Sequence, residues 1–274
     1  MKKILLPFDG IHFSESAFDF AKKLHEKNPI LLTGVFLPQI SYANVWSYAD
    51  GMGGPLFVPA LEESDKEVID KNIEKFEELC KRNQIEFRVR KDFTDLAMPE
   101  LKKETRFADL MIISGQSFYE NMGSGDPNIY LRDALHDIEC PAIVVPDHYT
   151  FPSNIILSYD GSESSVFAIK QFVYLLPELS ECNTMLIYVT TENGNDIPKE
   201  PYIEEYLTRH IKDLTISKLD MDPRKYFSKW IADKKSSLLI SGSFSRSAVS
   251  SLFRKSFVLD IIKEHKIPVF IAHK

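Results

Sequence analysis

The sequence predicts an α/β protein with two tandem domains, each built on a doubly wound, five-stranded parallel sheet. Three observations favour this fold class. Strand-like segments alternate with helix-like segments along the whole chain. The strand-like segments are short and almost wholly apolar, which is typical of strands covered by helices on both faces. The second half of the chain also repeats the motifs of the first, which indicates a duplicated unit.

The repeat rests on two motifs whose spacing is preserved. Each half opens with a short apolar run that ends in Asp-Gly, at Asp9 and at Asp160, and a serine follows each aspartate five residues later. Each half later contains an apolar run that ends in Ser-Gly, at Gly115 and at Gly242. A proline that opens a further apolar run follows each of these glycines after 26 residues. We therefore expect a first domain at 1–149, a linker near 148–153 and a second domain at 150–274.

The elements of each domain follow from local patterns taken in order. Ser14 can cap the first helix, the Glu/Lys-rich second helix presents a solvated face, and a proline opens each last strand. In the first domain we expect strands at 3–8, 30–36, 86–90, 110–114 and 142–145. The expected helices are 14–27, about 61–83, about 96–105 and 128–138. In the second domain we expect strands near 154–159, 184–190, 215–219, 237–241 and 268–272.

An insertion at 38–59 makes the first domain the longer one. It contains four aromatic residues and several glycines, a composition that predicts a structured loop rather than a helix. Loops of this length are often lids or contact surfaces. The corresponding part of the second half is shorter and polar.

Composition limits the classes of function. The formal net charge is −7 and there is no block of Lys and Arg, which argues against a nucleic-acid-binding role. No apolar run approaches the roughly 20 residues of a membrane-spanning helix, so we expect a cytoplasmic protein without a membrane partner. The three cysteines, like the seven histidines, lack the spacing of a metal site, so we expect no metal and buried or half-buried thiols. They are Cys80, Cys140 and Cys182.

Both conserved-spacing motifs fall where a ligand is expected. In an open parallel sheet, ligands bind beyond the carboxyl ends of the strands, at the point where the strand order reverses. Asp9 and Asp160 follow the first strand of each domain, and Gly115 and Gly242 follow the fourth. A carboxylate there could accept from a ribose hydroxyl or a base amino group, and a glycine lets backbone amides approach an anion. Asp-Gly is equally typical of a plain turn that leads into a helix.

These motifs together resemble the universal stress protein family in its tandem form, over essentially the whole chain. The resemblance rests on the residues 4–10 and 155–161, on the Ser-Gly motifs, and on Cys-Pro-Ala-Ile-Val-Val-Pro at 140–146. It implies Rossmann-like domains of the adenine nucleotide alpha hydrolase type that pair through their last strands. It also implies a stress-response or regulatory role without a defined reaction, and a homodimer is a further expectation from the family.

The resemblance also implies a nucleotide site, but its motif is degraded here. ATP-binding members carry Gly, two residues, Gly, nine residues, Gly, then Ser or Thr. In the first domain only Gly115 matches, and Phe118 stands where the backbone must approach phosphate. In the second domain the four positions are Gly242, Ser245, Lys255 and Ser256. The nearby cations Arg246, Arg254 and Lys255 could bind an anion, or they could form a solvated basic face.

The positions that contact adenine and ribose match the family better than the phosphate loop does. They are Asp9 and Val35 in the first domain, and Asp160 and Val189 in the second. The valines would equally suit any buried strand. These matches make ATP a candidate cofactor, with at most weak binding of ATP or another anionic nucleotide in the second domain.

Three classes of function remain open at this stage. The first is a non-enzymatic stress-response protein with a degraded ATP-binding motif, and its close alternative is an ATP-dependent switch or slow ATP hydrolase. The second is a phosphotransfer or nucleotide-hydrolysing enzyme, against which the sequence has no Walker motif. The third is an interaction module that grips an unknown protein partner through the aromatic insertion.

Overall fold

The computed structural model describes most of the chain. Its described backbone omits residues 39–40, 48–53, 61–62, 92–96, 121–128, 191–195, 223–225, 235, 243–260, 263, 265–266 and 273–274. In the hairpin described below, only the backbone is considered.

The first domain alternates strands and helices in the expected order, with one addition. Its first elements are β1 (Lys2–Phe8), α1 (Glu15–Lys27), β2 (Ile30–Phe36), β3 (Ser41–Ser47), β4 (Gly54–Ala60) and α2 (Glu63–Arg82). The remaining elements are β5 (Glu86–Lys91), α3 (Ala97–Arg106), β6 (Leu110–Ser114), α4 (Ile129–Asp137) and β7 (Ala142–Val145). Ser14 caps α1 as expected, because its side chain accepts a hydrogen bond from the Ala17 N–H.

The second domain repeats the plan, and its helices α6 and α7 are shorter than the corresponding α2 and α3. Its first elements are β8 (Asn154–Ser158), α5 (Glu163–Leu175), a short 3₁₀ turn (Pro177–Leu179), β9 (Asn183–Thr190) and α6 (Glu200–Leu207). They are followed by β10 (Leu214–Asp220), α7 (Ser228–Ala232), β11 (Ser237–Ser241) and β12 (Val269–Ile271). All five expected strands are therefore present within one or two residues of their expected ends.

The two domains share one ten-stranded sheet, in the order β10-β9-β8-β11-β12-β7-β6-β1-β2-β5. Neighbouring strands are parallel except where β12 meets β7, and there Phe270 lies opposite Ile143 in an antiparallel pair. The pairing of last strands that the resemblance implied is thus confirmed within one chain. Because each domain uses its last strand in this way, neither leaves that edge unpaired.

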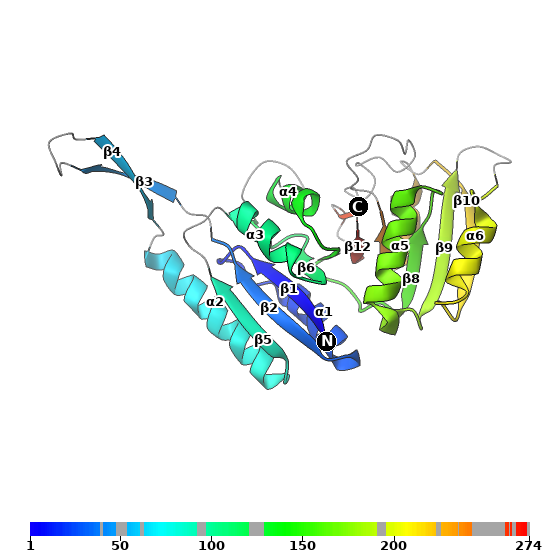
Figure 1. Cartoon of the computed structure of the whole chain (residues 1–274), viewed down its shortest axis with the longest axis horizontal. Helices are drawn as coiled ribbons and strands as arrows, with labels where there is room; N and C mark the ends of the chain where they lie inside the picture. The colour runs from blue at the N-terminus through cyan, green and yellow to red at the C-terminus, as the bar shows by residue number, and fades with distance from the viewer. Residues whose placement is uncertain are drawn as a thin grey trace.

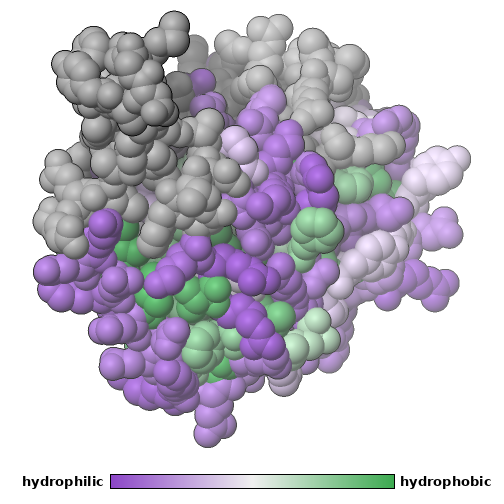
Figure 2. Space-filling view, turned by 60° about the vertical axis from the view of Figure 1, so that its left-hand side comes forward, coloured by the Kyte–Doolittle hydropathy of each residue, from purple (hydrophilic) through white to green (hydrophobic). Residues whose placement is uncertain are grey.

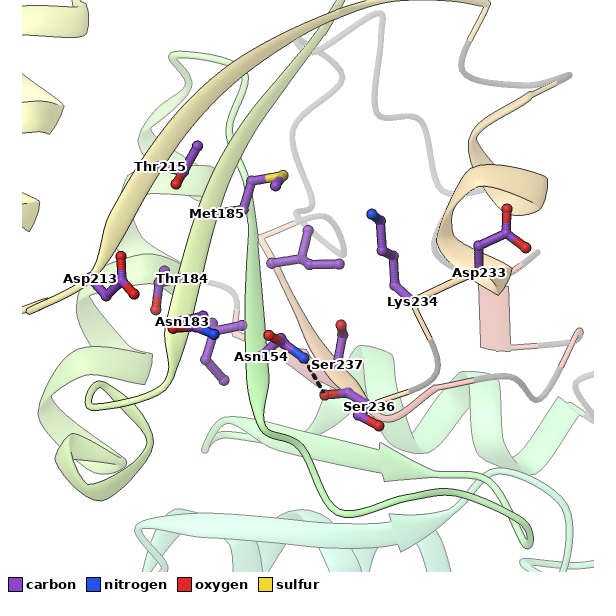
Figure 3. A pocket seen from close by; sticks show the side chains of 12 residues that line it. Asn154, Asn183, Thr184, Met185, Asp213, Thr215, Asp233, Lys234, Ser236 and Ser237 are labelled. Carbon is purple, nitrogen blue, oxygen red and sulfur yellow. Dashed lines mark hydrogen bonds between the residues drawn. The ribbon is translucent and has the colours of Figure 1, made fainter.

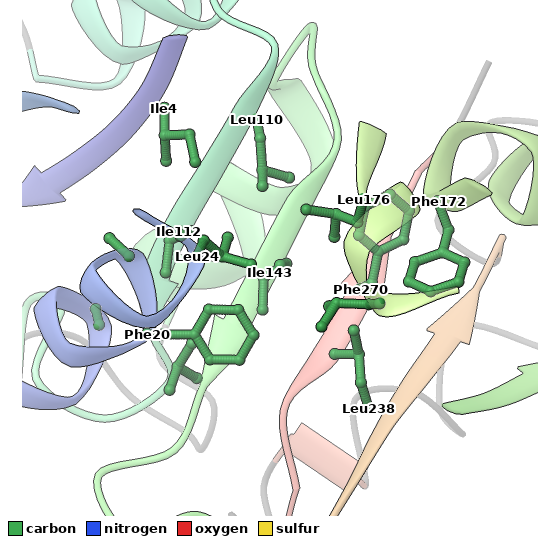
Figure 4. Close-up of a cluster of buried hydrophobic side chains, with 14 of the residues drawn as sticks. Ile4, Phe20, Leu24, Leu110, Ile112, Ile143, Phe172, Leu176, Leu238 and Phe270 are labelled. Atoms are coloured by element: carbon green, nitrogen blue, oxygen red, sulfur yellow. The ribbon is translucent and has the colours of Figure 1, made fainter. Parts of the chain in front are cut away.

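Helices cover both faces of the sheet and bury two apolar layers. One hydrophobic cluster joins α1, α2, α5 and α6 to the first face, and the other joins α3, α4 and α7 to the second. The first cluster crosses the domain junction, where Phe20 and Ile143 lie near Phe172 and Phe270 (Figure 4). The burial of continuous strands such as Leu110–Ser114 explains why their sequence shows no alternation.

Polar contacts also join the domains at this face. The Lys2 ammonium donates to the Leu175 carbonyl oxygen at 2.7 Å and lies 2.5 Å from the Glu178 carboxylate. The linker contributes Tyr149 and Phe151, whose rings pack on Phe20. The linker is therefore part of the junction and not a free tether.

The insertion forms a β-hairpin, where the sequence analysis expected a structured loop. Strands β3 and β4 pair antiparallel from Ser41 with Ala60 to Ser47 with Gly54. Figure 1 shows this hairpin standing away from the rest of the first domain, beyond the end of α2. The expectation missed the strands because glycine and proline are frequent in this segment, but β-branched and aromatic residues on either side of a turn also form hairpins.

The described surface agrees with the charged composition. Hydrophilic side chains dominate the face in Figure 2, and hydrophobic side chains show there only as separate patches. No helix in the described part of the chain combines the length and apolar character needed to cross a membrane.

Candidate functional site

The topology brings the sequence-predicted residues together at one edge of each domain. In the first domain β1 lies between β2 and β6, so Asp9, Val35 and Gly115 all lie at the carboxyl ends of three adjacent strands. The chain leaves β1 towards β2 on one side and returns in β6 on the other, which makes this the topological switch point. In the second domain β8 lies between β9 and β11, so Asp160, Val189 and Gly242 lie at the carboxyl ends of these three strands.

In the first domain, the carboxylate of Asp9 is occupied by its own chain. Its Oδ1 accepts from the backbone N–H of Ile11 at 3.0 Å and of His12 at 2.7 Å. Its Oδ2 accepts from the backbone N–H of Tyr119 at 3.0 Å and lies 2.7 Å from His12 Nδ1. Asp9 is only 4% exposed. A carboxylate offers about four lone-pair positions, and all four have a donor here.

Tyr119 covers this edge of the first domain with its side chain. It is 1% exposed, and its ring packs against Phe118 and Tyr130 at centroid distances of 4.7 and 4.6 Å. Its hydroxyl donates to the Leu37 carbonyl oxygen, immediately beyond β2. Burial raises the pKa of the Tyr119 phenol well above its ordinary value, and the negative charge of Asp9 adds to the shift. The hydroxyl therefore stays protonated and keeps its role as donor.

The turn that carries Asp9 is held from a second side. Gly10 adopts φ +92°, a left-handed conformation that suits glycine. The Asn72 side chain on α2 donates to the Gly10 and Ile11 carbonyl oxygens at 2.8 and 2.9 Å. The first domain's Asp-Gly motif is thus a fixed turn, as the simpler interpretation of the motif expected.

In the second domain, the Asp160 turn has the same form, and the segment that corresponds in sequence to the Tyr119 loop lies outside the described residues. Gly161 has φ +76°, and Asp160 Oδ1 accepts from the Ser162 N–H at 2.9 Å. Asp160 is partly exposed, whereas Asp9 is buried. Ser162 caps α5 by accepting from the Ser165 N–H. The helix α5 therefore begins directly beside the Asp160 carboxylate.

Gly242 lies in close backbone contact with the start of α5. The Ser164 hydroxyl donates to the Gly242 carbonyl oxygen. A Cβ at position 242 would overlap the backbone of Ser164 and crowd the Ser165 nitrogen. Glycine is therefore required here by packing between β11 and α5, whatever ligand the edge binds.

The remaining predicted residues divide into three groups. Val35 and Val189 are each 1% exposed and belong to the apolar layer on the second face, so their side chains serve the core. Gly115 follows β6 and donates its N–H to the Val145 carbonyl oxygen at 2.9 Å. Ser245, Lys255 and Ser256 lie outside the described residues, as do Arg246 and Arg254.

The second domain contains two cavities among its described residues. A cavity of about 570 Å³ lies at the amino ends of β8, β9 and β11, where Asn154, Asn183 and Ser237 begin these strands, with Lys234 beside them (Figure 3). It is at the opposite edge from Asp160 and contains none of the sequence-predicted residues. A second, of about 350 Å³, lies over the first turns of α5 and is lined by Gly161, Lys170 and Lys199 among others.

The described residues contain no group of three His, Cys, Asp or Glu side chains placed to hold a metal ion. Cys80 and Cys140 are buried, and burial raises the pKa of each thiol to about 12. Cys182 is half-buried. The expectation of buried or half-buried thiols is confirmed.

The sequence analysis missed three groups that define the first-domain edge: Tyr119, His12 and the Leu37 carbonyl oxygen. The His12 ring contacts Asp9, and its side chain is 33% exposed. The bulk of Phe118 was the available signal for an altered loop, and Tyr119 is its neighbour. No sequence pattern indicated that Tyr119 would turn back onto Asp9.

Comparison with known proteins supports the fold assignment. No protein-family model matches the sequence, and no curated protein matches it. Among solved structures, a universal stress protein from Archaeoglobus fulgidus DSM 4304 aligns with a TM-score of 0.67 at 17% identity, covering 100% of this chain and 96% of that one. The chain has the fold of a two-domain universal stress protein. A functionally unknown protein from Pseudomonas aeruginosa PAO1 aligns with a TM-score of 0.57 at 10% identity, covering 100% and 92%.

Proposed function

We propose that this chain is a non-enzymatic universal stress protein with a stress-response or regulatory role, in which only the second domain offers a ligand site. The observation that carries the proposal is the difference between the two aspartates. Asp9 is buried and has a donor at each acceptor position, whereas Asp160 is partly exposed at an edge where α5 begins. We expect the second domain to bind ATP or a related anionic nucleotide weakly.

Several features of the second domain support this site. The N-terminus of α5 lies beside Asp160 and carries the partial positive charge of a helix start. Lys170 and Lys199 line the adjoining cavity together with one carboxylate, Glu163. A carboxylate suits ribose hydroxyls or base amino groups, while cations and helix N–H groups suit phosphate. One end of a nucleotide would therefore meet acceptors and the other would meet donors.

Thermal-shift measurements with ATP and Mg²⁺, combined with native mass spectrometry, test the proposal. We expect millimolar to high-micromolar ATP binding, at one nucleotide per chain, that Asp160→Ala removes. Asp233→Ala is the matched control, because Asp233 lines the cavity at the opposite edge of the same domain. Sub-micromolar binding at two nucleotides per chain would contradict the proposal.

The enzymatic alternative has its own readout. An ATP hydrolase would release phosphate steadily, and the release would disappear in Asp160→Ala. We expect no such release above the uncatalysed background, because the sequence has no Walker motif and the described residues at this edge offer no paired general base.

The hairpin supports a second candidate function, which is self-association of the chain. Strands β3 and β4 make their main contacts with each other, and neither joins the ten-stranded sheet. A two-stranded hairpin alone is marginal in water. Between residues 38 and 60 the only charged residue is Asp50, so the hairpin lacks the lysines that normally protect an exposed edge.

The outer edge of β3 is the better template for strand addition. Pro55 and Pro59 remove two amide donors from β4, whereas β3 has no proline. A second copy of the chain would offer an equivalent uncharged edge, and two hairpins related by a two-fold axis would cover one another.

Sedimentation equilibrium of the full chain tests this arrangement. We expect a dimer that becomes monomeric when residues 41–60 are replaced by a short Gly-Ser linker. Val45→Lys on β3 should weaken the dimer more than Leu56→Lys, which changes the residue opposite it on β4. A full chain that is monomeric at high micromolar concentration would remove this function.

A further inference from the structure

The observations on the first domain point to a more specific role for one side chain. We propose that Tyr119 is a built-in occupant of the first domain's ligand site, which it closes by making the contacts that a bound planar ligand would make. The inference rests on the proposed function, because it takes the carboxyl edge of the sheet as the ligand-binding edge. It goes beyond the proposed function by assigning the closure to one residue.

The polar contacts of Tyr119 lie at the edge where a ligand is expected. Tyr119 supplies a backbone N–H to Asp9 and a phenol O–H to the Leu37 carbonyl oxygen. These two acceptors lie beyond the ends of β1 and β2, at the edge that the topology marks for a ligand. One residue thus satisfies the acceptors that a ligand would need from two neighbouring strands.

The Tyr119 ring occupies a buried space at the same edge. The Tyr119 ring is packed against Phe118 and Tyr130 and is 1% exposed. It therefore fills a space lined by the rings of Phe118 and Tyr130. The space suits a planar ring that carries hydrogen-bond donors at its rim, which is the chemistry of a nucleoside.

The backbone conformation of Tyr119 also supports the proposal. Its φ is +53°, in the left-handed region that a bulky residue rarely adopts. Such a conformation persists only where the surrounding contacts hold it. Here the contacts that hold it are the Asp9 and Leu37 hydrogen bonds and the aromatic packing.

The Asp9 carboxylate has a limited number of acceptor positions, and all of them are in use. Ile11, His12 and Tyr119 donate to its carboxylate through backbone N–H groups, and the His12 ring occupies the last position. The Ile11 and His12 N–H bonds belong to the Asp9 turn itself. A ligand can therefore reach Asp9 only by replacing the Tyr119 N–H or the His12 ring, whereas loss of the Tyr119 side chain frees the Leu37 carbonyl oxygen and the adjoining space.

Removal of the Tyr119 side chain tests the proposal directly. Glycine tolerates the left-handed backbone, so Tyr119→Gly empties the space without adding strain. The parent chain carries Asp160→Ala, so that the second domain does not contribute. Isothermal titration with adenosine is expected to show binding to Tyr119→Gly at one equivalent per chain, at least tenfold tighter than to the parent. Tyr119→Phe keeps the ring and should stay within threefold of the parent.

Phe118→Ala is the matched control, because it removes a neighbouring buried ring but leaves Tyr119 in place. Equal gains in Phe118→Ala and Tyr119→Gly would overturn the proposal, since general loosening would then explain both. A folded Tyr119→Gly without tighter binding would also overturn it. If Tyr119→Gly does not fold, as judged by circular dichroism, Tyr119→Asn decides instead, because asparagine also tolerates this backbone conformation.

The proposed function and the present inference are tested on different variants, so that either can be contradicted without the other. The proposed function would be contradicted if the unsubstituted chain bound no more ATP than Asp160→Ala does. Loss of the present inference would show as unchanged adenosine affinity in the Tyr119 variants, whatever the second domain does.

Discussion

The two domains share one plan but differ at the edge where a ligand would bind. In the first domain the Asp-Gly turn is buried, braced by Asn72 and covered by Tyr119. In the second domain the corresponding turn is partly exposed, and α5 begins beside it. The strands, their order and the core are nevertheless equivalent. The difference indicates that equivalent strand ends of one sheet can carry either a buried, covered turn or a partly exposed one.

The largest expected effect comes from the aspartates themselves. Asp9→Ala leaves the backbone N–H groups of Ile11, His12 and Tyr119 without their acceptor in a buried place, and we expect a loss of roughly 2–4 kcal/mol in the free energy of unfolding. Asp160→Ala should cost about 1 kcal/mol or less, because Asp160 is partly exposed. Urea unfolding followed by circular dichroism measures both. Equal losses in the two variants would mean that the buried Asp9 turn and the partly exposed Asp160 turn do not differ in their contribution to stability.

The packing of Gly242 gives the next effect. Gly242→Ala forces β11 and the start of α5 apart, and we expect a loss of roughly 1–3 kcal/mol. Amide hydrogen exchange should place the loss mainly in β11 and α5, with β1 and β2 less affected. Uniform loss of protection across both domains would instead mean that the shared sheet unfolds as one unit.

The ion pair across the junction should contribute less. A double-mutant cycle with Lys2→Ala and Glu178→Ala is expected to give a coupling of about 0.5–1 kcal/mol, because the pair is only partly shielded from solvent. Thermal unfolding of the four chains provides the values. A coupling near zero would mean that this ion pair adds nothing to the stability that β7–β12 pairing and the apolar cluster give the junction.

The smallest effect concerns the thiols and compares the domains without changing either. At pH 8, native protein should react with a thiol reagent faster at Cys182 than at Cys80 or Cys140. Cys80 and Cys140 are buried with pKa values near 12, whereas Cys182 is half-buried and burial raises its pKa too. Three reactive thiols before unfolding would mean that the first domain opens more readily than its packing indicates.

Most of the sheet could be predicted from sequence because its signal is local. Apolar runs such as Leu110–Ser114 have no alternation, and the repeated spacing fixes their equivalence in the two halves. The hairpin at 41–60 was not predicted because its glycines and prolines resemble a loop. The switch-point residues Asp9 and Gly115 were placed correctly, since topology alone brings strand ends together.

The closure of the first-domain edge could not be predicted, because it depends on contacts between distant residues. The Tyr119 N–H reaches Asp9 from 110 positions away, and only from a left-handed backbone conformation. Phe118 signalled an altered loop but not what would fill the space. The requirement for Gly242 was likewise assigned to an anion, whereas the structure shows a close contact with Ser164.

The central claim is that the chain has one nucleotide site, in the second domain. Native mass spectrometry of the full chain across an ATP titration with Mg²⁺ tests it most directly. The account predicts at most one ATP per chain, lost in Asp160→Ala and retained in Asp233→Ala. Two ATP molecules bound per chain, or one that survives Asp160→Ala, would contradict it.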